Sequence, residues 1–178
     1  MASSKVASKY ARALLDFSIE QKSIDKVNND MVGLANICKE SKDLTNMLKS
    51  PIIDKNKKVD VLNTVFGKSM DKISLQFIEL IVKNSRANIV PEIADSFVQL
   101  YKDHNNILDV YLTSAIPLEA SVKKEILAKI KTSYKGEFEV HESVDSKLLG
   151  GFIVNIDGKQ IDLSVASQLS NLKNILLN

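Results

Sequence analysis

Glycine is unevenly distributed along this chain. Residues 1–106 contain only Gly33 and Gly67, whereas four of the six glycines lie in the last 43 residues. Glycine marks turns and interrupts helices, so a glycine-poor stretch favours helices and a glycine-rich one favours short strands joined by turns. The distribution therefore predicts a helical first part and a second part that contains strands.

Six helices are expected before residue 106, because apolar residues recur there at helical spacing. Several ends carry capping signals: Asp54 is an N-cap, Gly67 closes a helix, and Pro91 lies in a first turn. The expected ranges are 4–21, 24–40, 42–49, 55–67, 71–84 and 89–105.

The period of the apolar residues changes after residue 106. Residues 107–115 are rich in β-formers and open a second domain. After them we expect a helix from Pro117 with Leu118, Val122, Ile126, Leu127 and Ile130, strands at 137–141 and 152–156, a hairpin turn at 157–160, and a last helix from about Asp162 with Val165, Leu169, Leu172 and Leu176. The predicted fold class is mainly α, with an N-terminal six-helix bundle (1–106) and a small α+β C-terminal domain (107–178).

Charge gives no sign of a nucleic-acid partner. The formal net charge is +2, and residues 1–106 carry +3 against −1 for residues 107–178. A nucleic-acid interface needs a dense basic stripe. The tightest basic cluster, Lys55, Lys57 and Lys58, is flanked by Asp54 and Asp60 and is expected to be a solvated helix start.

Residues that could carry catalysis or bind a metal or cofactor are scarce. His104 and His141 are isolated, with no second histidine at metal-ligand spacing. Cys38 lies on an apolar helix face, where thiols usually pack rather than react. Gly150 and Gly151 lack the rest of a phosphate-binding loop. We therefore expect no catalytic, cofactor-binding or metal-binding residues.

Targeting signals are equally scarce. No apolar run approaches the roughly 20 residues that span a bilayer, and the N-terminus has no secretory signal pattern. The sequence predicts a soluble, cytosolic protein.

Two of the expected helices carry more apolar surface than one core can cover. On the first, an apolar arc of roughly 200° runs from Ala13 to Leu15, and on the fifth an arc of roughly 220° runs from Leu80 to Leu75. One explanation is that both helices are covered by neighbours inside the bundle. The other is that they lie side by side and present a shared groove to a partner helix. The residues alone leave both open.

Four segments resemble the delta subunit of bacterial F-type ATP synthase, a family similar to the mitochondrial oligomycin-sensitivity-conferring protein. They are YARAL at 10–14, NSRANIVPEI at 84–93, VYLTSAIPL at 110–118 and VDSKLLGGFIV at 144–154. The four segments occur in the same order as in the family and together span nearly the whole chain, which makes the match specific. At Ser85 the chain departs from the family pattern, which usually has glycine there.

This resemblance implies a non-catalytic stator subunit of the ATP synthase. The N-terminal bundle would bind the N-terminal helix of an alpha subunit of the catalytic head, in a groove between the first and fifth helices lined by Tyr10, Ala13, Gln76 and Leu80. The C-terminal domain would bind the C-terminal ends of the b subunits of the peripheral stalk, through exposed apolar surface on its last helix and the neighbours of that helix. The head would then resist rotor torque during proton-driven ATP synthesis.

The resemblance also implies a location and excludes some partners. The chain would lie peripherally at the cytoplasmic face of the bacterial cell membrane and touch the membrane only through the complex. It would bind no cofactor and no nucleic acid.

Two alternatives of other classes remain. A generic helical adaptor would bind amphipathic helices without preferring an alpha-subunit sequence. An enzyme could use a carboxylate pair such as Glu137 and Glu139, which share one face of an expected strand.

Overall fold

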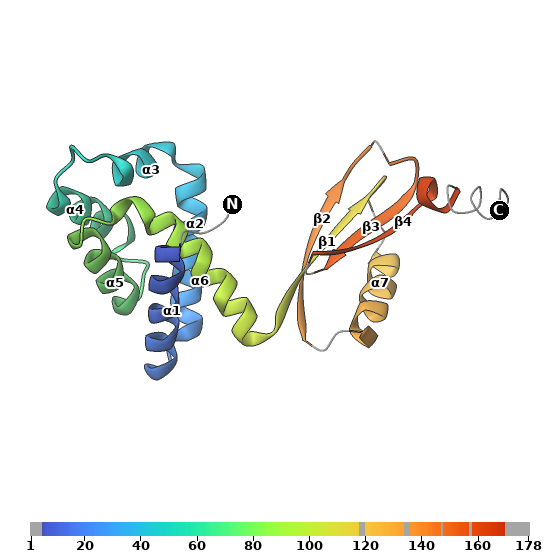
Figure 1. Cartoon of the computed structure of the whole chain (residues 1–178), viewed down its shortest axis with the longest axis horizontal. Helices are drawn as coiled ribbons and strands as arrows, with labels where there is room; N and C mark the ends of the chain where they lie inside the picture. Colours follow the sequence, from blue (N-terminus) through green and yellow to red (C-terminus); the bar gives the residue numbers. More distant parts are fainter. Residues whose placement is uncertain (1–4, 118–119, 134–135, 147, 157, 170–178) are drawn as a thin grey trace. The chain divides into compact units, whose positions relative to one another are not determined.

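The computed structural model describes residues 5–117, 120–133, 136–146, 148–156 and 158–169. The chain divides into two compact units, residues 1–101 and 102–178. The first is built from helices, and the second combines a four-stranded sheet with helix α7 (Figure 1). The predicted fold class, a helical bundle followed by a small α+β domain, is confirmed.

The helices of the first part begin and end within a few residues of their predicted bounds. They are α1 (Lys5–Glu20), α2 (Ile24–Glu40), α3 (Lys42–Lys49), α4 (Lys55–Phe66), α5 (Lys72–Lys83), the short 3-10 helix η1 (Ala87–Ile89) and α6 (Val90–Asn105). Side-chain caps explain this agreement. The Asp54 carboxylate accepts the Asn56 N–H at 2.8 Å, and the Asp71 carboxylate accepts the Ile73 N–H at 2.9 Å.

One apolar core joins these helices. Its largest fully buried side chains include Leu14, Met31, Leu34, Ile81 and Phe97. Cys38 belongs to the same core, as its apolar neighbours predicted. Burial, followed by the negative charge of Asp95, raises the pKa of the Cys38 thiol to about 11. The thiol is therefore protonated at neutral pH and packs like a small apolar group.

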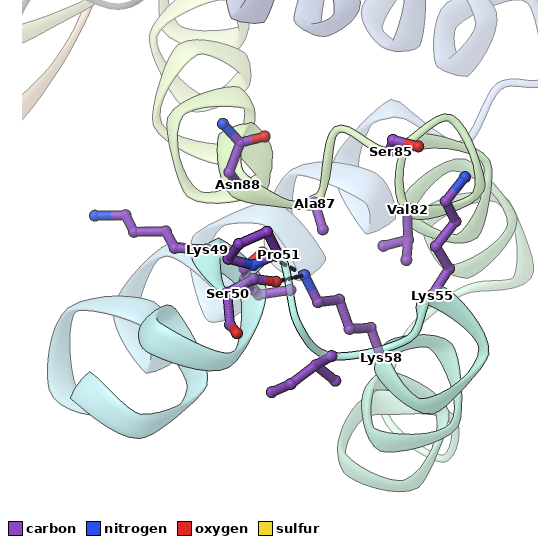
Figure 2. A pocket seen from close by; sticks show the side chains of 11 residues that line it. Lys49, Ser50, Pro51, Lys55, Lys58, Val82, Ser85, Ala87 and Asn88 are labelled. Atoms are coloured by element: carbon purple, nitrogen blue, oxygen red, sulfur yellow. Dashed lines mark hydrogen bonds between the residues drawn. The ribbon is translucent and has the colours of Figure 1, made fainter.

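Lys58 corrects the expectation of a solvated helix start. Its side chain is buried, only 7% exposed, and its Nζ donates to the Leu48 carbonyl at 2.9 Å and to the Ser50 carbonyl at 2.7 Å (Figure 2). These carbonyls lie at the C-terminal end of α3, where unpaired carbonyls and the helix dipole both favour a cation. Lys57 remains exposed, as expected.

Removing the Lys58 ammonium should destabilise the bundle. We expect Lys58→Met to lower the free energy of unfolding by about 2 kcal/mol, because two carbonyls lose a charged hydrogen-bond donor. Lys57→Met, one residue away and exposed, should change it by less than about 0.5 kcal/mol. Urea unfolding of the full chain measures both. Equal effects of the two substitutions would show that the buried ammonium contributes nothing.

The second unit contains a mixed sheet with strand order β2-β1-β3-β4. The elements are β1 (Ile107–Ser114), α7 (Ala120–Ser133), β2 (Glu137–Val144), β3 (Gly151–Ile156) and β4 (Lys159–Ser164). β1 and β2 are parallel and connected through α7, while β3 is antiparallel to both β1 and β4. Helix α7 covers one face of the sheet, where Ile126 and Ile130 pack against Val110, Leu112 and Val154.

Strand β4 corrects the prediction for the end of the chain. The last helix was expected from about Asp162, but Asp162 lies in β4, which pairs with β3 along its whole length. The Asp162 carboxylate accepts the Ser164 N–H at 2.8 Å, so this capping-type residue organises its own strand end and not a first helical turn. Helical residues begin at Val165, after Ser164, whose hydroxyl accepts the Ser167 N–H.

Three other boundaries of this unit differ from those predicted. β2 extends to Val144 because its pairing with β1 continues to that residue. Lys159 and Gln160 are paired with β3 in β4, so these two residues do not belong to the predicted hairpin turn. Helix α7 begins at Ala120 and not at Pro117. The predicted apolar positions Leu118, Leu172 and Leu176 lie outside the described residues.

The glycine pair at the start of β3 has a structural reason. Gly151 has φ +79°, and a Cβ on it would lie 2.4 Å from the Leu163 carbonyl oxygen. The neighbouring Gly150 carbonyl accepts the Val165 N–H at 3.0 Å. The two glycines therefore let β3 approach the end of β4 closely, which agrees with the conclusion that they form no phosphate-binding loop.

Candidate partner-binding face

Helix α1 carries two adjacent stripes with opposite environments. Its buried stripe consists of Ala7, Ala11, Leu14 and Ser18, at the spacing of one helix face. The four residues that directly precede these in the sequence form a second stripe: Val6, Tyr10, Ala13 and Phe17. Val6 is 42% exposed and Phe17 is 48% exposed. The bundle therefore leaves the second apolar stripe of α1 open.

Helix α5 repeats this arrangement. Its buried stripe consists of Ser74, Ile78 and Ile81, and the residues one position earlier are Ile73, Phe77 and Leu80. Ile73 and Phe77 are half-buried, while Leu80 is 52% exposed.

The two open stripes meet at an aromatic contact. The rings of Tyr10 and Phe77 pack edge to face, with centroids 6.5 Å apart. The two stripes therefore lie side by side, and we call their combined surface the α1–α5 face: Val6, Tyr10, Ala13, Phe17, Ile73, Phe77 and Leu80. Exposed apolar side chains grouped in this way are typical of interaction sites.

The predicted site residues lie on or beside this face. Ala13 and Leu80 are exposed on it, and Tyr10 is half-buried at its centre. Gln76 is exposed on α5, about 100° around the helix from Phe77. The structure gives Tyr10 an additional contact: Arg86 Nη1 donates to the Tyr10 hydroxyl at 2.6 Å. Arg86 was missing from the predicted site, although it is part of the NSR segment that carried the resemblance.

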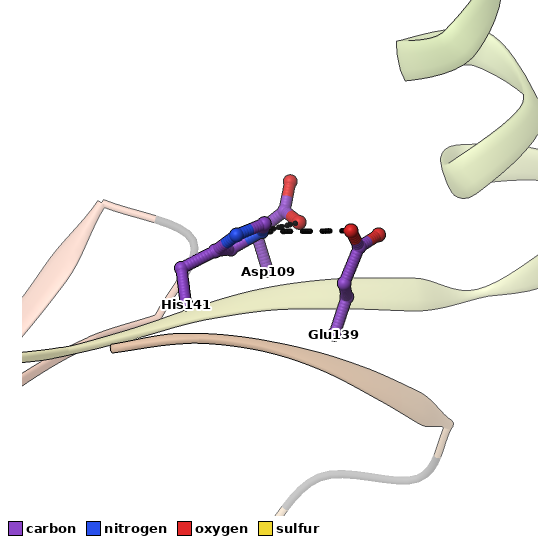
Figure 3. A group of neighbouring side chains, drawn as sticks. All are labelled: Asp109, Glu139 and His141. Carbon is purple, nitrogen blue, oxygen red and sulfur yellow. Dashed lines mark hydrogen bonds and ion pairs between the residues drawn. The ribbon is translucent and has the colours of Figure 1, made fainter. Parts of the chain in front are cut away.

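The face of the sheet opposite α7 carries a charged cluster. Lys102 Nζ lies 2.7 Å from Asp109 Oδ1 and 2.8 Å from Glu139 Oε2. His141 Nε2 lies 2.9 Å from the same Asp109 oxygen; Figure 3 shows Asp109, Glu139 and His141. The His141 ring stacks on Tyr111, with centroids 4.8 Å apart. Asp109 and Glu139 lie opposite each other in the β1–β2 register, so the sheet itself brings the carboxylates together.

This cluster has the residue types of a metal site, but a lysine already supplies the cation. Asp109, Glu139 and His141 each offer a ligand atom, and these atoms lie within 4.8 Å of one another. The Lys102 ammonium bonds both carboxylates, so a cation of the chain already balances their charge. Glu139, one member of the carboxylate pair considered for catalysis, is therefore an ion-pair partner, and the cluster is best described as an ion-pair network.

Asp109 makes the stability of the second unit depend on pH. Burial alone raises the pKa of this carboxyl, but hydrogen bonds from Lys102 and His141 outweigh burial and lower it. Its contribution is therefore fully present above the unfolded-state pKa of about 4 and is lost as the pH falls through the lower folded-state value. We expect Asp109→Asn to cost about 1–2 kcal/mol at pH 7 and to flatten the loss of stability in acid.

Urea unfolding between pH 3 and pH 7, with hydrogen exchange of the β1 and β2 amides as the reporter, tests this expectation. The matched control is Glu137→Gln, an exposed carboxylate of β2 with no ion pair among the described residues. An Asp109→Asn protein with wild-type pH dependence would contradict the assignment.

A pocket of about 390 Å³ lies where α3, α4, α5 and η1 meet, and Lys49, Lys55 and Lys58 are among its lining residues. The Lys55 amine is already bonded to the Lys83 carbonyl at the end of α5. The Lys58 amine is bonded to the Leu48 and Ser50 carbonyls at the end of α3 (Figure 2). Lys55 and Lys58 therefore serve as helix caps.

A second apolar surface lies at the end of the sheet. Ile161 and Leu163 of β4 are exposed, as are Val165 and Leu169 in the helical residues that follow. Through their pairing with Val154 and Phe152, Ile161 and Leu163 lie on the same face of the sheet as α7.

No helix among the described residues is long and apolar enough to cross a membrane.

Comparison with known proteins gives a consistent result over the full length. The family model for the ATP synthase delta (OSCP) subunit matches residues 6–176. The chain is 33% identical to the ATP synthase subunit delta of Cytophaga hutchinsonii, over 98% of this chain and 95% of that protein. It is 34% identical to the chloroplastic ATP synthase subunit delta of Ochrosphaera neapolitana, over 99% of each. A chain in the structure of the Toxoplasma gondii mitochondrial ATP synthase hexamer has the same fold, with a TM-score of 0.73, 23% identity and 98% of each chain covered.

Proposed function

This chain belongs to the ATP synthase delta (OSCP) subunit family, and from that premise we propose that it links the catalytic head of the ATP synthase to the peripheral stalk. Members of this family are non-catalytic subunits of the complex. The proposed role is mechanical: the subunit keeps the head from turning with the rotor during proton-driven ATP synthesis.

The α1–α5 face carries the first half of this proposal. We assign it to the N-terminal helix of an alpha subunit, with Tyr10, Ala13, Gln76 and Leu80 as contact residues. Two parallel stripes of exposed apolar side chains suit the apolar side of one amphipathic helix. The small Ala13 side chain lets the partner backbone approach, while Leu80 and Phe17 offer area for apolar burial.

The second unit is assigned to the stalk. Its exposed apolar residues on β4 and the following helical residues suit the C-terminal ends of the b subunits. In this role residues 1–106 bind the head and residues 107–178 bind the stalk. The chain lies at the cytoplasmic face of the bacterial cell membrane, and only the complex connects it to the membrane.

Slow dissociation is what such a linker needs. Torque loads the contact repeatedly, and affinity differences between related complexes reside mostly in the dissociation rate. Apolar contacts without buried unpaired charges suit a long-lived complex, because no desolvation penalty opposes their burial.

Isothermal titration of the full chain with a synthetic peptide tests the first contact. The peptide comprises about the first 25 residues of the alpha subunit from the same organism, long enough for several helical turns. We expect one-to-one binding with submicromolar affinity. A control peptide of the same composition, rearranged but still amphipathic, should bind at least 10-fold more weakly. Equal binding of both peptides would favour the generic adaptor, and no binding would overturn the alpha-subunit assignment.

A further inference from the structure

Arg86 is held beside the α1–α5 face by its own backbone. The Arg86 N–H donates to the Ile81 carbonyl at 3.1 Å, and the Ser85 N–H donates to the Val82 carbonyl at 3.0 Å. Ser85 has φ +62°. This is the Schellman arrangement that ends many helices, with the left-handed residue directly before the arginine. The end of α5 therefore fixes the backbone of Arg86, from which the side chain extends.

The Arg86 side chain in turn fixes Tyr10. Its guanidinium carbon lies 5.4 Å from the centre of the Tyr10 ring, and its Nη1 donates to the Tyr10 hydroxyl at 2.6 Å. The Tyr10 ring also contacts Phe77 edge to face. The central aromatic ring of the face is therefore held by an arginine and a phenylalanine, which lowers the entropy that binding would have to remove.

Arg86 retains unused hydrogen-bonding capacity toward solvent. A guanidinium has five N–H donors, and one is bonded to Tyr10. Arg86 is exposed, and no carboxylate of the described residues forms an ion pair with it. The nearest comparable cation in sequence, Lys83, is paired with Glu79 at 3.2 Å. Arg86 is thus a fixed and uncompensated positive charge at the edge of an apolar face.

The charged residues of α1 add to the positive charge of Arg86 at one end of the α1–α5 face. Tyr10, in the N-terminal half of α1, contacts Phe77 in the middle of α5 and Arg86 just beyond the C-terminal end of α5. Lys9 is exposed in that half of α1, whereas Asp16 and Glu20 are exposed in the other half. The end of the face near Arg86 is therefore basic.

We propose that Arg86 determines specificity at this face by pairing with a carboxylate of the bound helix, while it positions Tyr10 for contact with that helix. The inference rests on the proposed binding of an alpha-subunit helix. It assigns that helix an Asp or Glu at the edge of its apolar side, in the half that lies over Arg86. The planar guanidinium can bind a carboxylate with two parallel hydrogen bonds, a geometry that a lysine cannot provide.

The test is titration of the full chain with the alpha-subunit peptide at 50 mM and 300 mM salt. We expect Arg86→Gln to weaken binding about 10-fold at low salt and to reduce the salt dependence. Lys83→Gln, a nearby cation already paired with Glu79, should change the affinity less than about 3-fold. Arg86→Lys should retain the salt dependence but not the full affinity.

A double-mutant cycle locates the partner carboxylate. Each acidic residue of the peptide is replaced in turn by its amide, and one replacement should weaken binding to the wild type but leave binding to Arg86→Gln unchanged. Tyr10→Phe, which removes only the hydroxyl, should weaken binding less in the Arg86→Gln background than in the wild type.

The outcomes separate the two proposals. Suppose that the wild type binds the peptide. The inference is then overturned, and the proposed function left intact, if Arg86→Gln has no effect at either salt concentration or if no acidic residue of the peptide is coupled to Arg86. Absence of binding by the wild type would overturn the proposed function itself. A melting temperature of each variant that equals the wild-type value shows that a loss of affinity reflects the lost contact and not unfolding.

Discussion

Ala13→Asp should weaken binding of the alpha-subunit peptide at least about 100-fold, or about 3 kcal/mol. Ala13 is exposed on the α1–α5 face, between Tyr10 and Phe17 on one stripe of α1. A carboxylate at this position would be buried against the apolar side of the bound helix, which costs desolvation free energy. Isothermal titration of the full chain measures the loss.

The same substitution should leave the bundle folded. Replacing an exposed alanine by aspartate costs a helix about 0.7 kcal/mol in propensity, which shifts the melting temperature of a chain of this size by about 3 °C or less. Arg12→Asp is the matched control, since Arg12 is exposed on α1 about 160° from Tyr10. It should change the peptide affinity less than about 3-fold. A large fall in the melting temperature of Ala13→Asp would show instead that Ala13 belongs to the core.

Gly151→Ala should be the most destabilising single substitution in the second unit, at about 3–5 kcal/mol. A Cβ at residue 151 would lie 2.4 Å from the Leu163 carbonyl oxygen and 2.9 Å from the Ser164 Cα, and both are backbone atoms that cannot move aside without breaking the β3–β4 pairing. The left-handed φ of +79° adds a further penalty for any residue with a side chain.

Gly158→Ala separates these two causes. Gly158 has almost the same φ, +74°, but nothing lies within 4 Å of a Cβ built there. Its substitution should cost only about 1 kcal/mol, from backbone conformation alone. Hydrogen exchange of the β3 and β4 amides measures both variants, with the amides of α1 and α5 as an internal reference. Similar losses for the two glycines would mean that the close approach at Gly151 is not what requires glycine.

The sequence predicted the helices well because their signals are local. Asp54 and Asp71 cap helices through hydrogen bonds to residues two positions away, so the signal and the structure share one short segment. The stripes of α1 and α5 are also local, since the helical period determines which side chains share a face. Predicting the α1–α5 face therefore required only that the two helices be neighbours.

The features that sequence reasoning missed depend on distant partners. β4 is a strand because β3 pairs with it, whereas Asp162 within β4 is a residue type that also begins helices. Lys58 is buried because the end of α3 supplies carbonyls for its amine. Arg86 acquires its role from Tyr10, which lies 76 residues earlier in the chain. In each case the decisive neighbour comes from another element, and the sequence pattern around the residue is compatible with several environments.

The one-residue offset between the buried and open stripes has a consequence for how this protein can change. On α1, Ala7 and Ala11 are buried and maintain the fold, while their immediate predecessors Val6 and Tyr10 are exposed and half-buried, respectively. Neighbouring residues of α1 therefore serve different ends, one set the fold and, under the proposed function, the other set the bound helix. Under that proposal, substitutions in the open stripe would change how tightly the subunit binds its partner, with little effect on the stability of the domain that carries the contact.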